Sequence, residues 1–412
     1  MQDVPPKILI VSNEILGLGH LRIALRLSAC IQAELTDVSV LLLTGSLMTD
    51  AFPLPKGLDI IKIPTVARSE DSLKSAYRSL RLPLPFNEVK KLRERIIWET
   101  ARTYRPHLLL VDYRPAGVGG ELLPTLRALK RKRQTTLVLL LRDILGDPNV
   151  VRARWQGDQT MSALEEYDEI WIYGCQNLYD PIHEYQFPHT IARKIRFCGY
   201  LDIEPLVVRK DIRHTLGIAD EPLVLVTIGN GRVGFPVLDA YMGALKRLPN
   251  DLDVFSLIVG GPELPPEQSE IIDQQCQANT TEYSHRRLHF ARFLPHLLNY
   301  MEAADLVISL GGYNTVTEIL RLEKRAIVVP YVPLSKEQLI RASLMERLGL
   351  IQTVHPDRLS PEILAESILS ALHASPPTRQ RLQELGFDFG GLQRIRGHVM
   401  RILGRAPPQH MA

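Results

Sequence analysis

Short, continuously apolar segments alternate with amphipathic segments along nearly the whole chain of 412 residues. The apolar segments are too short for helices, and their lack of polar alternation is typical of parallel strands covered on both faces. This alternation predicts a doubly wound α/β fold. The strands expected in the first half are 7–12, 38–43, 108–112, 136–141 and 169–173, with helices over 21–34 and 86–104.

The pattern restarts in the second half, where each expected strand is again followed by a helix. A chain of this length exceeds one ordinary hydrophobic core, so two domains are expected. We predict two Rossmann-like domains, residues 1–204 and 205–390, and a last amphipathic helix and tail over 391–412 that can pack back on the first domain. The strands expected in the second half are 222–228, 254–259, 288–290, 306–309 and 326–330.

Composition narrows the class of function. Charged residues make up 23% of the chain and the net charge is only +3, so no nucleic acid partner is expected. The basic run at 130–133 is interpreted as a solvated helix end, with contact to anionic lipid or an acidic partner as the alternative. No signal-peptide pattern or apolar run of about 20 residues is present. We expect a cytoplasmic protein and leave peripheral membrane contact open.

Three glycine-containing loops follow expected strands, where helix N-termini attract phosphate groups. The first loop contains Gly17, Gly19 and His20. A helix N-terminus disfavours the imidazolium form, so a neutral His20 that can accept a proton is one interpretation. The alternative is a histidine that only caps the helix or fills the turn.

The second loop contains Gly229, Gly231 and Gly234, with Asn230 and Arg232 between them. Its glycines allow a ligand to approach the backbone, and Arg232 can pair with a negative charge. An ordinary turn between a strand and a helix is the alternative. An NAD site is disfavoured because no acidic residue ends the next strand at the expected spacing.

The third loop runs from Ser309 to Glu318 and contains Gly311 and Gly312. A helix is expected to begin near Thr315. Thr315 and Glu318 fit a capping box, which would explain Glu318 by structure alone. The alternative makes Glu318 an acceptor for the ribose hydroxyls of a nucleotide, and the spacing does not separate the two.

This third loop and the segments after it resemble a known family. The residues that carry the resemblance are DLVISLGGYNTVTEIL at 305–320, AIVVPY at 326–331, and Glu337 with Gln338. They are similar to the donor-binding half of GT-B glycosyltransferases, most of all to the MurG-like proteins of family 28. The resemblance implies two Rossmann-like domains with a nucleotide-sugar bound in an interdomain cleft. It also implies catalysis without a metal ion or a further cofactor.

Roles for single residues follow from the resemblance. Glu318 would bind the donor ribose, and the second and third loops would hold the diphosphate. Phe293 and Leu294 would lie where the family holds the edge of the uracil ring, and Gln338 would contact sugar hydroxyls. The full set expected to bind the donor is Gly17, Gly19, Gly229, Asn230, Gly231, Arg232, Phe293, Leu294, Gly311, Gly312, Asn314, Thr315, Glu318 and Gln338.

Two side chains are candidates for the catalytic base. His20 is one, and Asp143, which follows the expected strand 136–141, is the other. A structural ion pair between Arg142 and Asp143 is the alternative for Asp143. Asp112 also ends an expected strand, and a carboxylate that stabilises a loop is the favoured interpretation for it.

These residues together predict a glycosyltransferase that moves a sugar from a nucleotide diphosphate donor to an unknown acceptor. UDP is the expected nucleotide and an N-acetylhexosamine is the candidate sugar. The acceptor is either lipid-linked or a small molecule. Two alternatives remain open: a UDP-sugar 2-epimerase and a non-catalytic nucleotide-sugar-binding protein.

Overall fold

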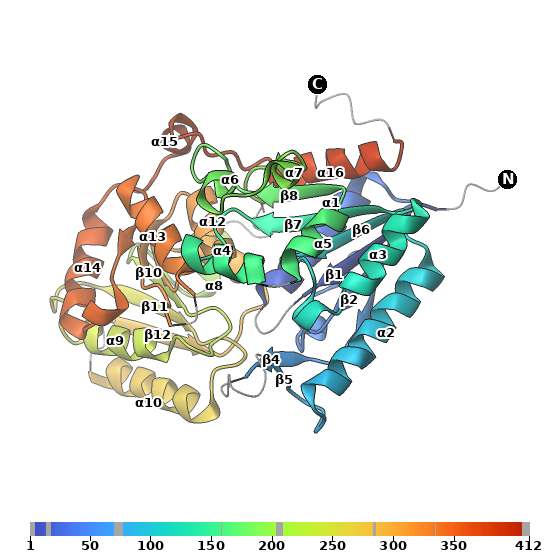
Figure 1. The fold of residues 1–412 in the computed structure, drawn as a ribbon. Coiled ribbons are helices and arrows are strands. Elements are labelled where there is room, and N and C mark those ends of the chain that lie inside the picture. The colour runs from blue at the N-terminus through green and yellow to red at the C-terminus, as the bar shows by residue number, and fades with distance from the viewer. Residues whose placement is uncertain are drawn as a thin grey trace. The chain divides into compact units, whose positions relative to one another are not determined.

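The computed structural model describes residues 5–13, 18–69, 77–157, 159–202, 209–282, 286–333 and 335–405. The chain forms two compact units. The first unit comprises Met1–Leu201 and Asp388–Ala412, and the second comprises Asp202–Phe387. Each unit is built around one parallel β-sheet that is flanked by helices (Figure 1).

The sheet of the first unit has seven parallel strands in the order β3-β2-β1-β6-β7-β8-β9. Aliphatic residues fill its central strands, and every residue of β6 is buried. The strands are β1 (Lys7–Ser12), β2 (Ser39–Thr44), β3 (Leu58–Lys62), β6 (Leu108–Asp112), β7 (Thr136–Arg142), β8 (Glu169–Tyr173) and β9 (Ile195–Phe197). A separate antiparallel pair consists of β4 (Val66–Arg68) and β5 (Tyr77–Ser79).

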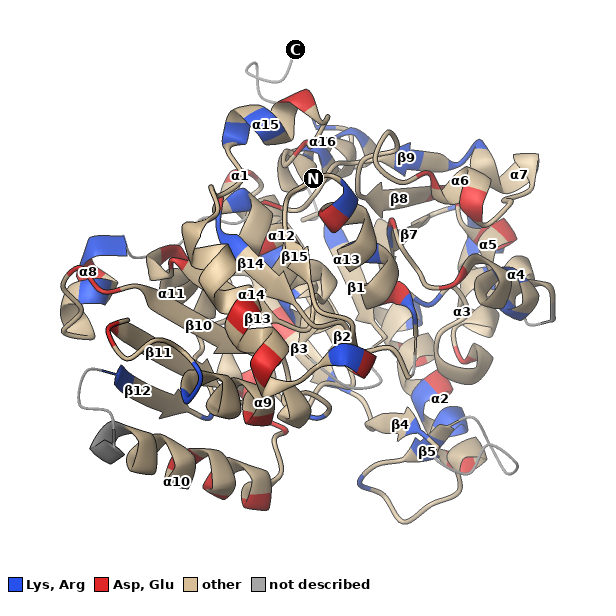
Figure 2. Ribbon diagram, turned by 90° about the vertical axis from the view of Figure 1, so that its left-hand side faces the viewer, with Lys and Arg blue, Asp and Glu red and all other residues tan. Residues whose placement is uncertain are grey.

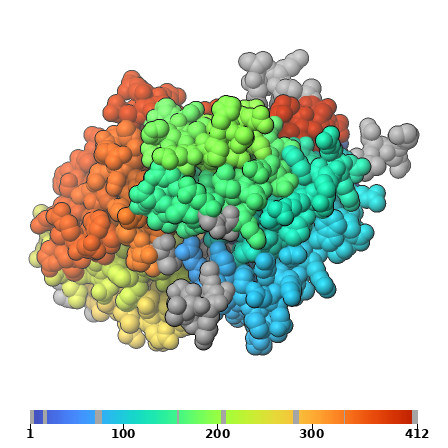
Figure 3. Space-filling model, in the orientation of Figure 1, coloured from blue at the N-terminus to red at the C-terminus, as the bar shows by residue number. Residues whose placement is uncertain are grey.

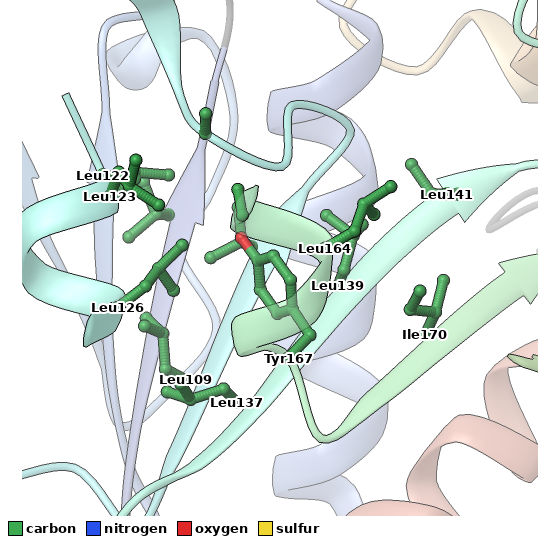
Figure 4. Close-up of a cluster of buried hydrophobic side chains, with 14 of the residues drawn as sticks. Leu109, Leu122, Leu123, Leu126, Leu137, Leu139, Leu141, Leu164, Tyr167 and Ile170 are labelled. Atoms are coloured by element: carbon green, nitrogen blue, oxygen red, sulfur yellow. The ribbon is translucent and has the colours of Figure 1, made fainter. Parts of the chain in front are cut away.

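Helices cover the sheet of the first unit. Figure 4 shows leucines of α3 and α5 packed with Tyr167 against strands of the sheet. Tyr167 is fully buried, and its hydroxyl donates to the carbonyl oxygen of Pro115 at 2.7 Å. The helices are α1 (Gly19–Glu34), α2 (Phe86–Tyr104), α3 (Leu123–Lys132), α4 (Pro148–Gly157), α5 (Thr160–Glu166), α6 (Pro181–Glu184), α7 (His189–Ala192) and α16 (Gly391–Ile402), with short 3₁₀ turns at Thr49–Ala51 and Val118–Gly120.

The last helix, α16, packs within the first unit. Ile395 on this helix is fully buried. The ring of His398 lies 5.3 Å from that of Trp171 on β8. Arg396 forms an ion pair with Glu34 of α1 at 3.2 Å. These contacts join the C-terminal helix to both the sheet and the first helix of its unit.

The sheet of the second unit has six parallel strands in the order β12-β11-β10-β13-β14-β15. The strands are β10 (Leu223–Thr227), β11 (Val254–Val259), β12 (Arg286–Ala291), β13 (Leu306–Ser309), β14 (Arg325–Val328) and β15 (Gln352–Thr353). The helices are α8 (Arg209–Thr215), α9 (Phe235–Leu245), α10 (Pro266–Glu282), α11 (Leu297–Ala303), α12 (Tyr313–Arg321), α13 (Glu337–Arg347), α14 (Pro361–His373) and α15 (Arg379–Glu384), with a 3₁₀ turn at Pro356–Arg358.

The helices also form the surface of each unit. In the space-filling view, α2 belongs to the outer surface of the first unit and α14 to that of the second (Figure 3). Acidic and basic residues are interspersed along the helices of both units (Figure 2). This mixed distribution agrees with the small net charge of +3.

Candidate functional site

Each sheet has one point where the order of its strands reverses. In the first unit this point lies between β1 and β6, and in the second unit it lies between β10 and β13. Loops that leave the carboxyl ends of two such strands diverge to opposite faces, which opens a crevice where α/β proteins bind ligands. Several of the predicted site residues lie near these two reversal points.

At the reversal point of the first unit, His20 forms a pair with Asp112. His20 lies in the first turn of α1, and its Nδ1 is 2.6 Å from Oδ2 of Asp112 at the end of β6. The other carboxylate oxygen of Asp112 accepts a hydrogen bond of 2.9 Å from the hydroxyl of Tyr173. The side chain of Asp112 is 1% exposed and that of His20 is 14% exposed. The carboxylate is therefore held from two sides, while the imidazole reaches the surface.

The contact with Asp112 determines which nitrogen of the imidazole carries the proton. An ionised carboxylate only accepts hydrogen bonds, so Nδ1 of His20 carries the proton that Asp112 accepts. Nε2 is then the nitrogen with a lone pair, able to take a proton from a substrate hydroxyl. In such a transfer, Asp112 would stabilise the imidazolium that forms.

Sequence reasoning missed the contact of Asp112 with His20, because Asp112 was interpreted as a loop-stabilising carboxylate. The signal lies in the register of the sheet, where Ser12 of β1 pairs with Asp112 of β6. A loop that leaves β1 therefore begins beside Asp112. Gly19 is the first residue of α1. Gly17, which was expected to bind the donor, lies outside the described residues.

Asp143 has a different environment from His20. It is 1% exposed, and its Oδ2 accepts a hydrogen bond of 2.8 Å from the hydroxyl of Tyr200. Its Oδ1 accepts from the backbone N–H of Ile144 at 2.7 Å. These contacts tie the loop after β7 to the segment after β9 and favour a structural role over that of a base. Arg142 places its guanidinium 5.4 Å from the ring centre of Tyr113.

In the second unit, the loop after β10 packs against the loop after β11. A Cβ on Gly231 would lie 2.4 Å from the carbonyl oxygen of Gly260, so only glycine fits there. The backbone N–H of Glu263 donates to the carbonyl oxygen of Asn230 at 2.7 Å. A Cβ on Gly229, in contrast, would meet no atom within 4 Å. Gly229 therefore presents its backbone to open space beside the reversal point.

The same loop leads directly into a helix. Gly234 is the N-cap of α9, and a Cβ there would lie 2.3 Å from the Cβ of Ile228. Arg232 is exposed, and its backbone N–H donates to Oδ1 of Asn230 at 3.3 Å. The three residues of this loop thus contribute differently. Gly234 allows close packing, Gly229 leaves its backbone open, and Arg232 provides an exposed cation.

The loop after β13 corrects one expectation. Gly312 is the N-cap of α12 without a side-chain cap, and the helix begins at Tyr313 rather than near Thr315. The capping box of Thr315 and Glu318 is therefore wrong, because Thr315 already lies inside the helix, after Asn314. Glu318 lies in the second turn and is 3% exposed. A buried carboxylate in the second turn has no capping function, so the capping box does not explain Glu318.

The two glycines of this loop differ in their surroundings. Gly311 has φ of 79°, and a Cβ on it would lie 2.5 Å from Cγ1 of Val328. Gly312 has φ of −60° and ψ of 153°, and a Cβ on it would meet no atom within 4 Å. Gly311 is required by the turn. Gly312 leaves the N-terminus of α12 open to a ligand.

The first turn of α13 lies against the strand β14 and the third loop. Oε1 of Gln338 accepts from the backbone N–H of Tyr331 at 2.8 Å, which leaves the amide NH₂ as its donor group. Arg341 is 3% exposed; it donates to the carbonyl oxygen of Gly311 at 3.3 Å and to Oε1 of Glu337 at 2.8 Å. Sequence reasoning missed Arg341, although its spacing of four residues from Glu337 is a usual helix ion pair.

Phe293 and Leu294 follow β12 at the same edge of the sheet. The preceding Arg292 donates to the carbonyl oxygen of Leu264 at 3.0 Å, which joins this segment to the loop after β11. The predicted donor residues of the second unit therefore lie on the loops that follow β10, β12 and β13, in the first two turns of α12 and in the first turn of α13. His20, Asp112 and Asp143 lie at the corresponding edge in the first unit.

The described residues lack two further features. They contain no cluster of three or more His, Cys, Asp or Glu side chains that could hold a metal ion. In the same part of the chain, we find no helix with the length and apolarity needed to cross a membrane.

Comparison with known proteins agrees with the geometry of the second unit. The model of the glycosyltransferase family 28 C-terminal domain matches residues 266–385. An uncharacterized glycosyltransferase of Methanopyrus kandleri is 27% identical over 186 residues, which cover 45% of this chain and 48% of the relative. The UDP-N-acetylglucosamine–N-acetylmuramyl-(pentapeptide) pyrophosphoryl-undecaprenol N-acetylglucosamine transferase of Thermodesulfovibrio yellowstonii is 29% identical over 213 residues, 50% of this chain and 55% of the relative.

The chain thus spans about half the length of the curated relatives that it matches. Among solved structures, MurG of Acinetobacter baumannii has a TM-score of 0.56 at 17% identity, covering 97% of this chain and 99% of that one. This likeness extends over both units and confirms the predicted GT-B fold. Residues 266–385 thus match the C-terminal domain of glycosyltransferase family 28, and the chain is similar to MurG-like glycosyltransferases.

Proposed function

We propose that the protein transfers a sugar from a nucleotide diphosphate donor, with UDP as the nucleotide, to a hydroxyl of an acceptor. The observation that carries the transferase assignment is the hydrogen bond of 2.6 Å between His20 and Asp112 at the reversal point of the first sheet. A nucleotide-sugar-binding protein without catalysis has no need for an oriented base. The donor half of the proposal is supported by the family 28 domain at 266–385.

The second unit would bind the donor through backbone groups. The first N–H groups of α9 and α12 lack partners within their helices and carry the positive end of the helix dipole. The open backbone at Gly229 and Gly312 lets a diphosphate approach them. Arg232 adds a cation, and Glu318 would accept hydrogen bonds from the ribose. One such preorganised donor typically lowers the barrier by about 3 kcal/mol when charge develops on the leaving group.

The first unit would activate the acceptor. Nε2 of His20 takes the proton of the acceptor hydroxyl as its oxygen forms a bond to the anomeric carbon. The bond from that carbon to the diphosphate oxygen breaks, and its electron pair leaves with the nucleotide diphosphate. Asp112 stabilises the imidazolium, which returns its proton to solvent. This direct displacement implies inversion at the anomeric carbon.

The names of the relatives suggest a donor sugar and an acceptor. The Thermodesulfovibrio yellowstonii relative is named for UDP-N-acetylglucosamine as donor and an undecaprenol-linked acceptor. For this chain we propose a UDP-linked N-acetylhexosamine as the first donor to test. A cytoplasmic location, with peripheral membrane contact where the acceptor is lipid-linked, is part of the same proposal.

The proposal is tested by incubating the purified protein with a panel of nucleotide-sugars and identifying the retained compound by mass spectrometry. The retained donor is then incubated with acceptor pools, and the products are analysed. Transfer of the sugar to an acceptor supports the proposal. Retention of no nucleotide-sugar contradicts it, and release of an epimer without an acceptor would show the epimerase instead.

Gly312→Ser is expected to weaken UDP binding by about tenfold, which corresponds to 1.4 kcal/mol. The serine side chain would enter the open space in front of α12, and its hydroxyl would accept from N–H groups that we assign to the diphosphate. Serine is a favourable N-cap residue, so the melting temperature should stay the same or rise. Isothermal titration with UDP and thermal denaturation measure the two effects.

Gly311→Ser tests the other glycine of this loop, which the turn requires. Its positive φ of 79° and the contact of 2.5 Å with Val328 predict a lower melting temperature. If Gly312→Ser binds UDP as tightly as the unmodified protein, the N-terminus of α12 does not hold the diphosphate.

A further inference from the structure

A cavity of about 260 Å³ in the first unit is lined by three arginines from three separate segments. Arg68 ends β4, Arg114 follows β6, and Arg154 lies on α4. Among the described residues that line this cavity there is no aspartate or glutamate. We call it the arginine cavity. Neither the sequence motifs nor the donor site accounts for it.

The three guanidinium groups are close enough to affect one another. Burial, followed by the charges of Arg114 and Arg154, lowers the pKa of Arg68 below its usual value. Arg114 donates to the hydroxyl of Tyr77 at 2.9 Å, but its Nε is buried and has no hydrogen-bond partner among the described residues. Clustered arginines with unused donors are the usual recognition group for phosphate or carboxylate.

The walls of the arginine cavity are held by a buried ion pair. Arg93 and Glu121 are both fully buried and are joined by two hydrogen bonds of 2.6 Å. Arg93 also donates to the carbonyl oxygen of Pro64, before β4, at 2.6 Å. Glu121 accepts from the backbone N–H of Val118 at 3.3 Å, in the loop that lines the cavity. The pair thus fixes the segments that carry Arg68 and Arg114.

Tyr113 connects this cavity to the catalytic pair. It lines the cavity, its ring centre lies 5.0 Å from that of His20, and the guanidinium of Arg114 lies 5.8 Å from its ring centre. Its φ of 70° is a left-handed conformation that costs a non-glycine residue about 1 kcal/mol or more. Such strain is tolerated mostly at functional sites. Tyr113 therefore both lines the cavity and lies beside His20.

We propose that the arginine cavity binds a phosphate monoester of the acceptor, whose reacting hydroxyl then reaches Nε2 of His20. A monoester carries nearly two negative charges at neutral pH, whereas a diester carries one, and three guanidinium groups favour the higher charge. The acceptor would thus be a phosphorylated hydroxyl compound, either a small molecule or a lipid. This inference rests on the proposed function, since it names the acceptor class of the same reaction.

The test is a calorimetric titration of the full chain with glycerol 3-phosphate and, separately, with glycerol. Saturating UDP is present, so that phosphate does not bind at the donor loops. We expect binding of glycerol 3-phosphate but not of glycerol. The affinity for glycerol 3-phosphate should fall by about tenfold in each of three variants, Arg68→Gln, Arg114→Gln and Arg154→Gln, since each removes a charged hydrogen-bond donor. Arg131→Gln, an exposed arginine on α3, is the matched control and should bind unchanged.

A second arm identifies the source of the monoester. Sedimentation with phosphatidylcholine vesicles that contain phosphatidic acid tests a lipid monoester, and vesicles with phosphatidylglycerol supply the diester. A lipid acceptor is supported if the protein binds vesicles with phosphatidic acid but not those with phosphatidylglycerol, and if the three arginine variants lose this binding. Binding of glycerol 3-phosphate supports a small acceptor. Equal binding to both vesicle types, or binding in neither arm, overturns the proposal.

The two proposals fail in different ways. UDP titration alone tests the donor site, and it does not involve the three arginines. If UDP does not bind, the proposed function fails, and the phosphate titration is repeated without UDP to test the cavity by itself. If UDP binds and the arginine variants bind glycerol 3-phosphate like the unmodified protein, only the acceptor inference is wrong.

Discussion

His20→Gln is expected to lower kcat for sugar transfer by roughly 10²–10⁴-fold, the usual contribution of a general base. Glutamine retains a hydrogen-bonding side chain of similar size but cannot take the acceptor proton. Because the proposed diphosphate loops at Gly229 and Gly312 lie in the second unit, and glutamine leaves the backbone at Gly19 unchanged, the affinity for UDP should change little. Release of UDP in the presence of donor and acceptor gives the rate, and isothermal titration with UDP gives the affinity.

Asp112→Asn extends this prediction to the partner of His20. The variant keeps the shape of the side chain but removes the carboxylate that fixes the tautomer and stabilises the imidazolium. We expect a loss of kcat in the same direction, with little added loss when both substitutions are combined, because the two residues act as one unit.

His183→Gln is the matched control for these variants. This histidine lies on α6 of the same unit with its side chain 85% exposed, so its replacement should leave the rate unchanged. A His20→Gln enzyme with normal kcat would exclude His20 as the base. Asp143 would then be the next residue to replace.

The central strands could be predicted from the sequence because burial on both faces dictates their composition. The expected ranges 7–12, 108–112, 169–173, 254–259 and 306–309 agree with β1, β6, β8, β11 and β13. The strands at the edges could not be predicted in this way. In β3, for example, only Leu58 is buried while Asp59 and Lys62 are exposed, so the apolar pattern is interrupted. The strand β15 has only two residues.

The site was predicted less completely, since its partners are brought together by tertiary structure. His20 and Asp112 are 92 residues apart, and only the pairing of β1 with β6 places them in contact. The start of α12 was misplaced because a threonine and a glutamate at capping-box spacing are a strong local signal. The helix instead begins after Gly312, whose backbone provides the extended N-cap geometry without any side chain. Local patterns thus located the loops but not the contacts between them.

Glu318→Gln is expected to weaken UDP binding by roughly 10–100-fold. A hydrogen bond to a charged group contributes about 1.5–3 kcal/mol, and the charge is lost while the volume of the side chain is kept. The prediction follows from the position of α12, because a carboxylate that is 3% exposed in the second turn does not serve as a cap. Isothermal titration with UDP measures the change. Glu366→Gln, an exposed glutamate on α14 of the same unit, is the matched control.

The nucleotide itself shows whether Glu318 acts on the ribose. If it does, 2′-deoxy-UDP should bind the unmodified protein more weakly than UDP does. In Glu318→Gln the difference between the two nucleotides should shrink, since the partner of the missing hydroxyl has already been weakened. A variant that discriminates between them as strongly as the unmodified protein would show that Glu318 supports the fold of α12 and leaves the ribose to another residue.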